Sequence, residues 1–323
     1  MSTFSWQQLK KTTNRPLYVL APMADVTDCA FRAIIAKYGK PDVTWTEFVS
    51  ADGLVRATPE GKKKLLKDLD YTEAERPIVA QLFGSNVENM EKAAKLCKDL
   101  GFDGIDLNMG CPDRSIEKQG AGAGMIKNPK RAQEIIRAAM TAGLPVSVKT
   151  RIGYNKNELD TWLPAILETK PALVTIHART RKEMSLVPAD WAQVMKAVEI
   201  RDQHSHETLI FGNGDALSID DAKSKADFSG ADGVMLGRAI FGTPWLFSNV
   251  KFDLHKRLDI MVEHTKLFEE KLGGIKNFAI MKKHYKAYVN GFDGAKELRE
   301  KLMMAENAGE VENIVNSWKK VTK

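Results

Sequence analysis

The sequence predicts an α/β fold, a (β/α)8 TIM barrel followed by a small all-helical C-terminal domain. Two observations favour the barrel: short apolar runs alternate with amphipathic helical stretches, and this alternation occurs eight times before residue 247. After residue 247 the strand signals stop and only helical patterns follow. We therefore expect a barrel domain over residues 1–247 and a helical domain over residues 248–323.

The predicted strands are apolar runs bounded by polar or glycine-containing turns. Their cores are continuously apolar, as in Gly-Val-Met-Leu at 233–236, which is typical of strands buried on both faces of a parallel sheet. The eight expected strands are Leu17–Met23, Val43–Phe48, Ile78–Gly84, Gly104–Met109, Pro145–Arg151, Leu173–Thr180, Leu209–Gly214 and Gly233–Ala239. Helical patterns lie between them, such as 86–100, with Asn86 as the expected N-cap, and 128–142.

A doubly wound open sheet is the competing fold for this alternation. That fold would more naturally carry a glycine-rich dinucleotide-binding turn after its first strand. Here the first strand ends in Ala21-Pro22-Met23-Ala24-Asp25, which contains no glycine. The barrel is therefore favoured.

The C-terminal region is predicted to be helical and basic. We expect helices over 254–272, 277–289, 296–305 and 310–318, separated by Gly273-Gly274, Asn290-Gly291 and residues 306–309. Residues 271–301 contain 8 Lys or Arg but only 3 Asp or Glu. Such a region suits a polyanionic partner, above all a nucleic acid, although a solvated helical surface would also explain it.

Composition excludes several classes of protein. The apolar and charged fractions, 43% and 28%, are those of an ordinary globular protein, and no run of apolar residues is long enough to span a membrane. The amino terminus lacks the features of a signal peptide. The three cysteines are widely separated, so neither a zinc site nor a disulfide framework is expected. We expect a reduced, cytoplasmic, metal-free monomer.

Cys111 lies in a Gly-Cys-Pro turn directly after the fourth predicted strand. Active sites of α/β barrels form at the carboxyl ends of their strands, where a thiol can donate a proton or attack an electrophile. An inert, packed cysteine is the alternative. The glycine-rich stretch 120–124 that follows suggests a mobile active-site loop.

Nearly all of the remaining predicted strands are also followed by polar groups. Two glycine-containing turns, Asn213-Gly214-Asp215 and Gly237-Arg238, follow the seventh and eighth strands, where barrels often bind phosphate. Lys149 could stabilise negative charge on a bound ring, Gln81 could hydrogen-bond the edge of that ring, and His177 could contact a ligand or be a core histidine. The complete set is Pro22, Met23, Ala24, Glu47, Gln81, Asn108, Cys111, Lys149, Arg151, His177, Arg179, Asn213, Gly214, Asp215, Gly237 and Arg238.

These motifs together resemble those of the tRNA-dihydrouridine synthase family over nearly the whole chain. The most specific is Asp106-Leu-Asn-Met-Gly-Cys-Pro-Asp-Arg-Ser-Ile-Glu-Lys-Gln-Gly-Ala-Gly-Ala123. Supporting it are Leu20-Ala-Pro-Met-Ala-Asp-Val-Thr-Asp28, Val79-Ala-Gln-Leu-Phe-Gly84, Val146-Ser-Val-Lys149, His177-Ala-Arg-Thr-Arg181, Asn213-Gly-Asp215, Met235-Leu-Gly-Arg238, Lys282-Lys-His-Tyr285 and Leu298-Arg299.

The resemblance implies an FMN-binding catalytic barrel and a helical tRNA-binding domain. It implies that NADPH or NADH reduces FMN, that the flavin passes hydride to C6 of a uracil in tRNA, and that Cys111 protonates C5. The residues implied to hold FMN are Pro22, Met23, Ala24, Gln81, Lys149, His177, Asn213, Gly214, Asp215, Gly237 and Arg238. Those implied to contact the substrate are Asn108, Arg151, Arg179, Arg181, Lys282, Lys283 and Lys286.

The segment 182–188 departs from the family pattern. Many relatives have a tyrosine and a glycine before Pro188-Ala-Asp-Trp191, where this chain has Ser185 and Val187. The resemblance therefore implies the flavin site but not RNA contacts of this loop.

Two other functions fit part of the sequence. An FMN barrel oxidoreductase of a small molecule such as dihydroorotate would explain the phosphate turns and Lys149, but not the basic helical region. An RNA-binding barrel without catalysis should have lost Cys111, Lys149 or Arg238, yet all three are present.

Overall fold

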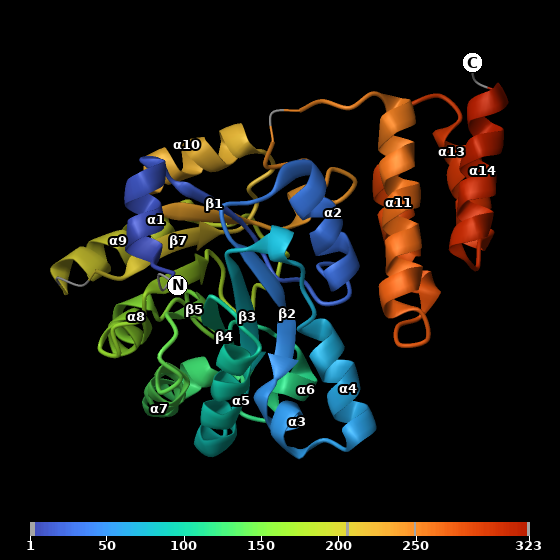
Figure 1. Ribbon diagram of the computed structural model, residues 1–323. Coiled ribbons are helices and arrows are strands. Elements are labelled where there is room, and N and C mark those ends of the chain that lie inside the picture. The colour runs from blue at the N-terminus through green and yellow to red at the C-terminus, as the bar shows by residue number, and fades with distance from the viewer. Residues whose placement is uncertain (1–3, 205–206, 249, 322–323) are drawn as a thin grey trace.

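The computed structural model describes residues 4–204, 207–248 and 250–321. Within these residues, eight parallel strands form one sheet that curls into a TIM-barrel-like body (Figure 1). The strands run in the order β1-β8-β7-β6-β5-β4-β3-β2, so β2 to β8 are adjacent in chain order and β1 pairs with β8. Their bounds are β1 Leu17–Leu20, β2 Thr44–Ser50, β3 Ile78–Phe83, β4 Gly104–Met109, β5 Val146–Arg151, β6 Leu173–His177, β7 Leu209–Asn213 and β8 Gly233–Leu236. Each predicted strand is present, but the first, sixth and eighth end three residues earlier than predicted.

Two carboxylates help to join β1 to β2, the two ends of this hydrogen-bonded order. The backbone N–H of Asp42 donates to the Tyr18 carbonyl (3.0 Å), and the Asp42 carboxylate accepts the Tyr18 N–H (2.7 Å). At the other end, the Glu47 carboxylate accepts the N–H of Asp25 (2.5 Å), in the loop after β1. Side chains thus supply part of the cross-strand bonding that a regular ladder would otherwise provide.

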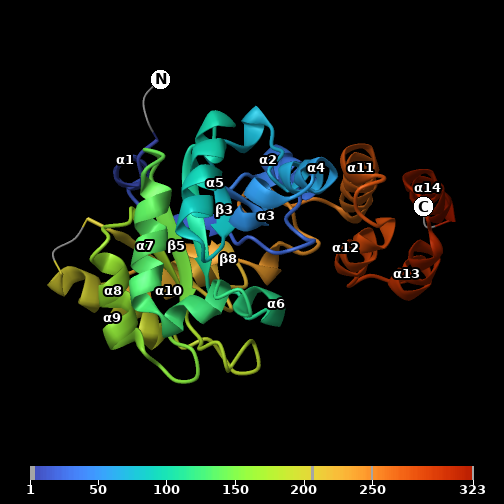
Figure 2. The ribbon, with the colours of Figure 1, turned by 90° about the horizontal axis from the view of Figure 1, so that it is seen from below.

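Helices cover the outside of the sheet, as the alternating pattern predicts (Figures 1 and 2). Asn86 is confirmed as the N-cap of its helix, because its side chain accepts the N–H of Asn89 (2.9 Å). The covering helices are α2 Cys29–Gly39, α3 Ala51–Arg56, α4 Pro59–Asp68, α5 Val87–Asp99, α6 Arg114–Glu117, α7 Pro129–Met140, α8 Leu159–Leu167, α9 Trp191–Gln203 and α10 Ile219–Ser229, with short 3-10 helices η1 Glu73–Glu75, η2 Gly122–Lys127 and η3 Arg238–Ile240.

Helix α1, Trp6–Thr13, closes the amino-terminal end of the barrel. Its Trp6 is fully buried and packs against Trp45 of β2 and Phe211 of β7, with ring centroids 5.4 and 5.8 Å apart. This aromatic cluster fills the barrel floor, so the open end lies at the carboxyl ends of the strands.

The C-terminal region is helical, as predicted. Its helices are α11 Leu254–Leu272, η4 Phe278–Ile280, α12 Met281–Tyr288, α13 Ala295–Met304 and α14 Ala308–Val321. They lie to one side of the barrel (Figure 2) and share a hydrophobic core with Ala30 and Ile34 of α2 and with Trp245. The division at residues 247 and 248 stays a prediction. None of the helices in the described ranges has the combined length and apolar character that crossing a bilayer requires.

Lys276, in the loop after α11, forms ion pairs with carboxylates of the barrel. Its Nζ lies 2.8 Å from Glu47, 3.1 Å from Asp68 at the end of α4 and 3.5 Å from Asp25. Only 14% of the Lys276 side chain and 6% of the Glu47 side chain are exposed, so the pair with Glu47 is shielded from solvent. The pair with Glu47 also connects the helical region to the junction between β1 and β2.

Two buried histidines pack between the barrel and the helical region. His264 of α11 stacks on Phe31 of α2, with ring centroids 4.7 Å apart. The ring centroid of His284 of α12 lies 4.7 Å from that of His264 and 5.6 Å from that of Phe241. Their ring nitrogens have no hydrogen-bond partner within the described residues. Burial lowers the pKa of His264 well below its ordinary value and that of His284 to about 3.

These two histidines should make the free energy of unfolding depend on pH in the mildly acidic range. The unfolded chain takes up protons at a histidine pKa of about 6.5, whereas the folded protein resists protonation until much lower pH. The free energy of unfolding should therefore fall by roughly 1.4 kcal/mol per pH unit for each histidine as pH drops below about 6. Urea unfolding between pH 7 and 4.5 measures this slope. A His264→Phe, His284→Phe variant should have a shallower slope, and equal slopes would contradict the assignment.

Candidate active site

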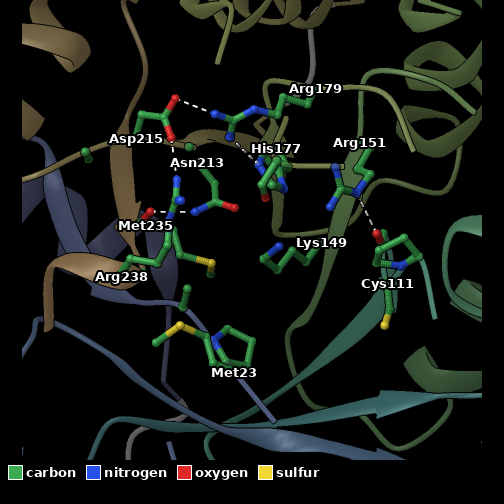
Figure 3. Close-up of a pocket in the computed structure, with 18 of the residues that line it drawn as sticks. Met23, Cys111, Lys149, Arg151, His177, Arg179, Asn213, Asp215, Met235 and Arg238 are labelled. Carbon is green, nitrogen blue, oxygen red and sulfur yellow. Dashed lines mark hydrogen bonds and ion pairs between the residues drawn. The ribbon is translucent and has the colours of Figure 1, made fainter. Parts of the chain in front are cut away.

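A pocket opens at the carboxyl ends of the strands and brings together most of the predicted site residues (Figure 3). Predicted residues that line it are Pro22, Met23, Asn108, Cys111, Lys149, Arg151, His177, Arg179, Asn213, Gly214, Asp215, Gly237 and Arg238. Ala24, Glu47, Gln81 and Arg181 lie outside this lining. The predicted RNA contacts Lys282, Lys283 and Lys286 are on α12, with Lys283 and Lys286 exposed and Lys282 half-buried.

The turn that carries Cys111 is held by side chains of two strands. The Asn108 Oδ1 accepts the backbone N–H of Cys111 (2.9 Å) and that of Gly110 (3.1 Å). On the other side, the Arg151 Nε donates to the Gly110 carbonyl (2.8 Å). Burial raises the pKa of the Cys111 thiol, so the thiol keeps its proton at neutral pH. A protonated thiol suits a proton donor better than a nucleophile.

The glycine-rich stretch 120–124, expected to be a mobile loop, is instead mostly packed against this turn. Residues 121–124 are buried, and Gly122 begins the 3-10 helix η2. The Ala123 N–H donates to the Cys111 carbonyl (2.9 Å). Gly122 has φ of +56°, and a Cβ there would lie 2.7 Å from that same carbonyl oxygen. Glycine is therefore required by close packing, which the sequence alone does not distinguish from mobility.

Lys149 and His177 lie deep in the pocket. Burial, reinforced by the charge of Arg151, lowers the pKa of Lys149 to about 8. Burial also lowers the pKa of His177, with the surrounding cations adding to the effect. Its Nε2 lies 3.2 Å from the Arg179 Nη1, a contact in which the unprotonated nitrogen accepts from the guanidinium. His177 is thus neutral, while Lys149 retains most of its positive charge at pH 7.

The two turns predicted to bind phosphate meet at the opposite side of the pocket from Cys111 (Figure 3). The Asp215 carboxylate of the first turn joins it to the second, because it accepts from the Arg238 Nη2 (2.6 Å). The same carboxylate also accepts from Arg179, in the loop after β6. Gly214 has φ of +128°, and a Cβ there would lie 2.7 Å from the Ala189 Cβ. The Arg238 side chain remains 65% exposed, so its guanidinium is accessible to an anion.

Gln81 uses its amide within the barrel. Its Nε2 donates to Asp106 (2.6 Å), and its Oε1 accepts from the Asn108 Nδ2 (3.1 Å). Its predicted contact with a flavin ring stays a prediction; these two bonds leave one N–H and one lone pair of the amide unused. Asp106 was not among the expected site residues, although a carboxylate within an apolar strand was a visible signal.

Arg181 connects two loops of the site. Its guanidinium pairs with both oxygens of Glu117 in α6 (2.7 and 2.6 Å) and lies over the Tyr154 ring. Arg151 similarly donates to the carbonyls of Thr180 and Met184 (both 3.1 Å). These two arginines therefore fasten the Cys111 segment to the loop after β6, and their predicted contacts with substrate remain predictions. Ser185 and Leu217 also line the pocket.

Within the described ranges, no three His, Cys, Asp or Glu side chains gather in an arrangement that could hold a metal ion.

The fold and the pocket define a class of barrel enzyme with a cysteine, a lysine and several arginines gathered at the carboxyl ends of its strands. The family model "Dihydrouridine synthase (Dus)" matches residues 19–323, and the chain belongs to this family. It is 38% identical over 319 residues to a probable tRNA-dihydrouridine synthase 2 of Bacillus subtilis (strain 168), covering 98% of this chain and 96% of that protein. It is also 38% identical over 317 residues to a probable tRNA-dihydrouridine synthase of Staphylococcus aureus (strain MRSA252), covering 97% and 95%.

Solved structures with low sequence identity share the fold. Morphinone reductase in complex with tetrahydroNAD matches with a TM-score of 0.50 at 14% identity, over 71% of this chain and 85% of that one. Histamine dehydrogenase from Rhizobium sp. 4-9 matches with a TM-score of 0.52 at 13% identity, over 77% and 48%.

Replacing Gly122 by Ala should disturb the Cys111 turn more than replacing Gly120. Both glycines have positive φ, +56° and +72°, but a Cβ at Gly120 has its nearest neighbour in Ser85 at 3.6 Å. We expect Gly122→Ala to cost about 1–3 kcal/mol more in the free energy of unfolding than Gly120→Ala. Chemical denaturation of the two variants tests this difference, and equal losses would show that contact with the Cys111 carbonyl is unimportant.

Proposed function

We propose that the protein is a tRNA-dihydrouridine synthase that uses FMN and NADPH or NADH to reduce the C5–C6 bond of a uracil base. The observation that carries the proposal is that Cys111, whose thiol pKa burial raises, shares one pocket with two glycine-containing turns and the exposed Arg238. The names of the relatives support tRNA as the substrate. The protein would act in the cytoplasm as a monomer.

The residues of the pocket fit FMN. Exposed Arg238 and the backbone N–H groups of the two glycine-containing turns are donors suited to a phosphate. The Asp215 carboxylate would orient Arg179 and Arg238 rather than contact the phosphate, because like charges repel. Pro22 and Met23 would provide apolar contact, with Ala24 beside them, and His177 and Gln81 would supply neutral polar groups.

Each side chain then has a defined task. When bound, reduced FMN supplies the hydride that forms the new C6–H bond. Lys149 would hold positive charge beside the ring and rise in pKa as negative charge is brought near. Cys111 would transfer its S–H proton to C5, so that hydride and proton together saturate the double bond, and solvent would reprotonate the thiolate. Asn108 would keep the turn in place for this transfer.

The base must leave its stack to reach this pocket. Uracil in a folded RNA is stacked on its neighbours, so it would be turned out into the barrel mouth. The lysines of α12 would bind the phosphate backbone, an interaction that weakens with salt. Arg151, Arg179 and Arg181 line or support the same mouth and would assist RNA binding.

The rival functions make different demands. A small-molecule reductase would not need the basic surface of α12, and a barrel without catalysis would not need a half-buried, protonated Cys111 in its pocket. Mapping dihydrouridine in tRNA from cells that lack the protein, and adding the purified protein back, separates all three. Restored dihydrouridine supports the proposal, whereas unchanged tRNA contradicts it.

Replacing Cys111 by Ala should remove the proton donor while sparing the cofactor. We expect the variant to bind FMN and oxidise NADPH normally, yet to form dihydrouridine at least ~100-fold more slowly. Cys97→Ala, a cysteine change in the buried face of α5, is the matched control and should retain activity. Undiminished dihydrouridine formation by Cys111→Ala would exclude the thiol as the acid.

Replacing Lys282, Lys283 and Lys286 together by Gln should weaken tRNA binding but not flavin reduction. The slope of log affinity against log salt concentration should fall by about 0.7–0.9 for each lost phosphate contact. Replacing Lys92, Lys95 and Lys98 of α5 makes the same charge change on an outer helix of the barrel and should have little effect. Filter binding at several salt concentrations measures both slopes, and identical behaviour would exclude α12 as the RNA surface.

A further inference from the structure

A buried chain of polar side chains runs from the middle of the barrel to the Cys111 turn. Asp106 of β4 and Gln81 of β3 are fully buried, and Asn108 is 9% exposed. The Gln81 Nε2 donates to the Asp106 Oδ2 (2.6 Å), and the Asn108 Nδ2 donates to the Gln81 Oε1 (3.1 Å). The Asn108 Oδ1 then accepts the N–H groups of Gly110 and Cys111.

The direction of every bond in this chain follows from the carboxylate at its start. An ionised carboxylate only accepts, so Gln81 must turn its NH2 group toward Asp106. The Gln81 oxygen therefore faces Asn108, which must present its own NH2 group in return. The Asn108 oxygen is left facing two backbone N–H groups, which need an acceptor.

The reverse orientation would leave buried donors facing donors. If Gln81 turned its oxygen toward position 106, its NH2 group would face Asn108, and Asn108 would turn its NH2 group toward the Cys111 N–H. Two backbone donors would then lose their acceptor in a buried site, which is costly. Ser147, whose Oγ donates to the other Asp106 oxygen (2.5 Å), helps to hold the carboxylate as an acceptor.

We propose that Asp106 is a positioning residue that fixes the turn of Cys111 through the amide orientations of Gln81 and Asn108. The hydrogen-bond argument is independent of the reaction, but the consequence for catalysis rests on the proposed function. The charged form of Asp106 is supported by the same contacts: burial raises its pKa to about 6, while the bonds from Ser147 and Gln81 and the charge of Lys149 oppose that rise.

The test exchanges the carboxylate and the amide. Asp106→Asn removes the fixed direction, because an amide at 106 can present either a donor or an acceptor. Gln81→Glu places a second carboxylate against Asp106. The double variant Asp106→Asn, Gln81→Glu restores the direction of the hydrogen bonds. The new amide at position 106 donates to the new carboxylate at position 81 and accepts from Ser147. The carboxylate at position 81 still accepts from Asn108. The net charge equals that of the natural protein.

The first readout needs neither FMN nor tRNA. The rate of Cys111 alkylation by iodoacetamide is followed by peptide mass spectrometry, with buried Cys29 and Cys97 as internal references. We expect each single variant to alkylate roughly tenfold faster, the factor associated with losing one buried hydrogen bond. The double variant should return to within about twofold of the natural protein. Ser147→Ala, which removes a bond to the same carboxylate without reversing the chain, should stay within about twofold.

A double variant that alkylates as fast as the faster single variant, or a Ser147→Ala variant that matches Asp106→Asn, would overturn the proposal. If a single variant does not fold, the rate of the double variant alone decides. Dihydrouridine formation on tRNA is the second readout: Asp106→Asn, which leaves the proposed flavin contact Gln81 unchanged, should form dihydrouridine more slowly than the natural protein. Rescue of alkylation together with no dihydrouridine formation by the natural protein would leave the positioning role standing and reject the proposed function.

Discussion

The junction between β1 and β2 is the constraint on which the rest of the structure depends. At one end of the junction Asp42 bonds to both backbone groups of Tyr18, and at the other Glu47 accepts from Asp25. Curling the sheet brings the loops after β1, β4, β6, β7 and β8 and the end of β5 around one opening. If these bonds were lost, Met23 would no longer be held across the pocket from the Cys111 turn.

The same burial has opposite consequences for the acids and bases of the pocket. It raises the pKa of the Cys111 thiol and lowers the pKa of Lys149 and His177, because each shift favours the uncharged form. Cys111 and His177 are therefore neutral, and the charge that persists comes mainly from the arginines. Asp215 balances Arg179 and Arg238 only in part, so the pocket is electrostatically prepared for an anion.

Much of the fold could be predicted from the sequence because the interior of a parallel barrel demands apolar strands. The ends of the strands were harder to predict: the sixth was expected over Leu173–Thr180, but its pairing with both neighbouring strands stops at His177. The Cys111 turn was recognisable from its position after a strand.

The partners of the site residues could not be predicted, since they come from distant parts of the chain. Arg181 pairs with Glu117, 64 residues earlier, and Gln81 bonds to Asp106, 25 residues later. Knowing that a residue is glutamine does not specify which of its neighbours the amide oxygen faces and which the NH2 group faces. Likewise, small residues at 120–124 are equally compatible with a mobile loop and with close packing.

Lys276 helps to set the distance between helix α12 and the mouth of the pocket. By pairing with Glu47 and Asp68, it fastens the segment just before α12 to the rim of the barrel, so the basic face of that helix and the mouth of the pocket keep a set separation. An RNA that binds both surfaces must therefore conform to the protein. In the proposed function, the uridine that reaches the thiol would be selected by its distance and angle from the part of the RNA bound to α12. The nucleotide sequence around that uridine would not select it.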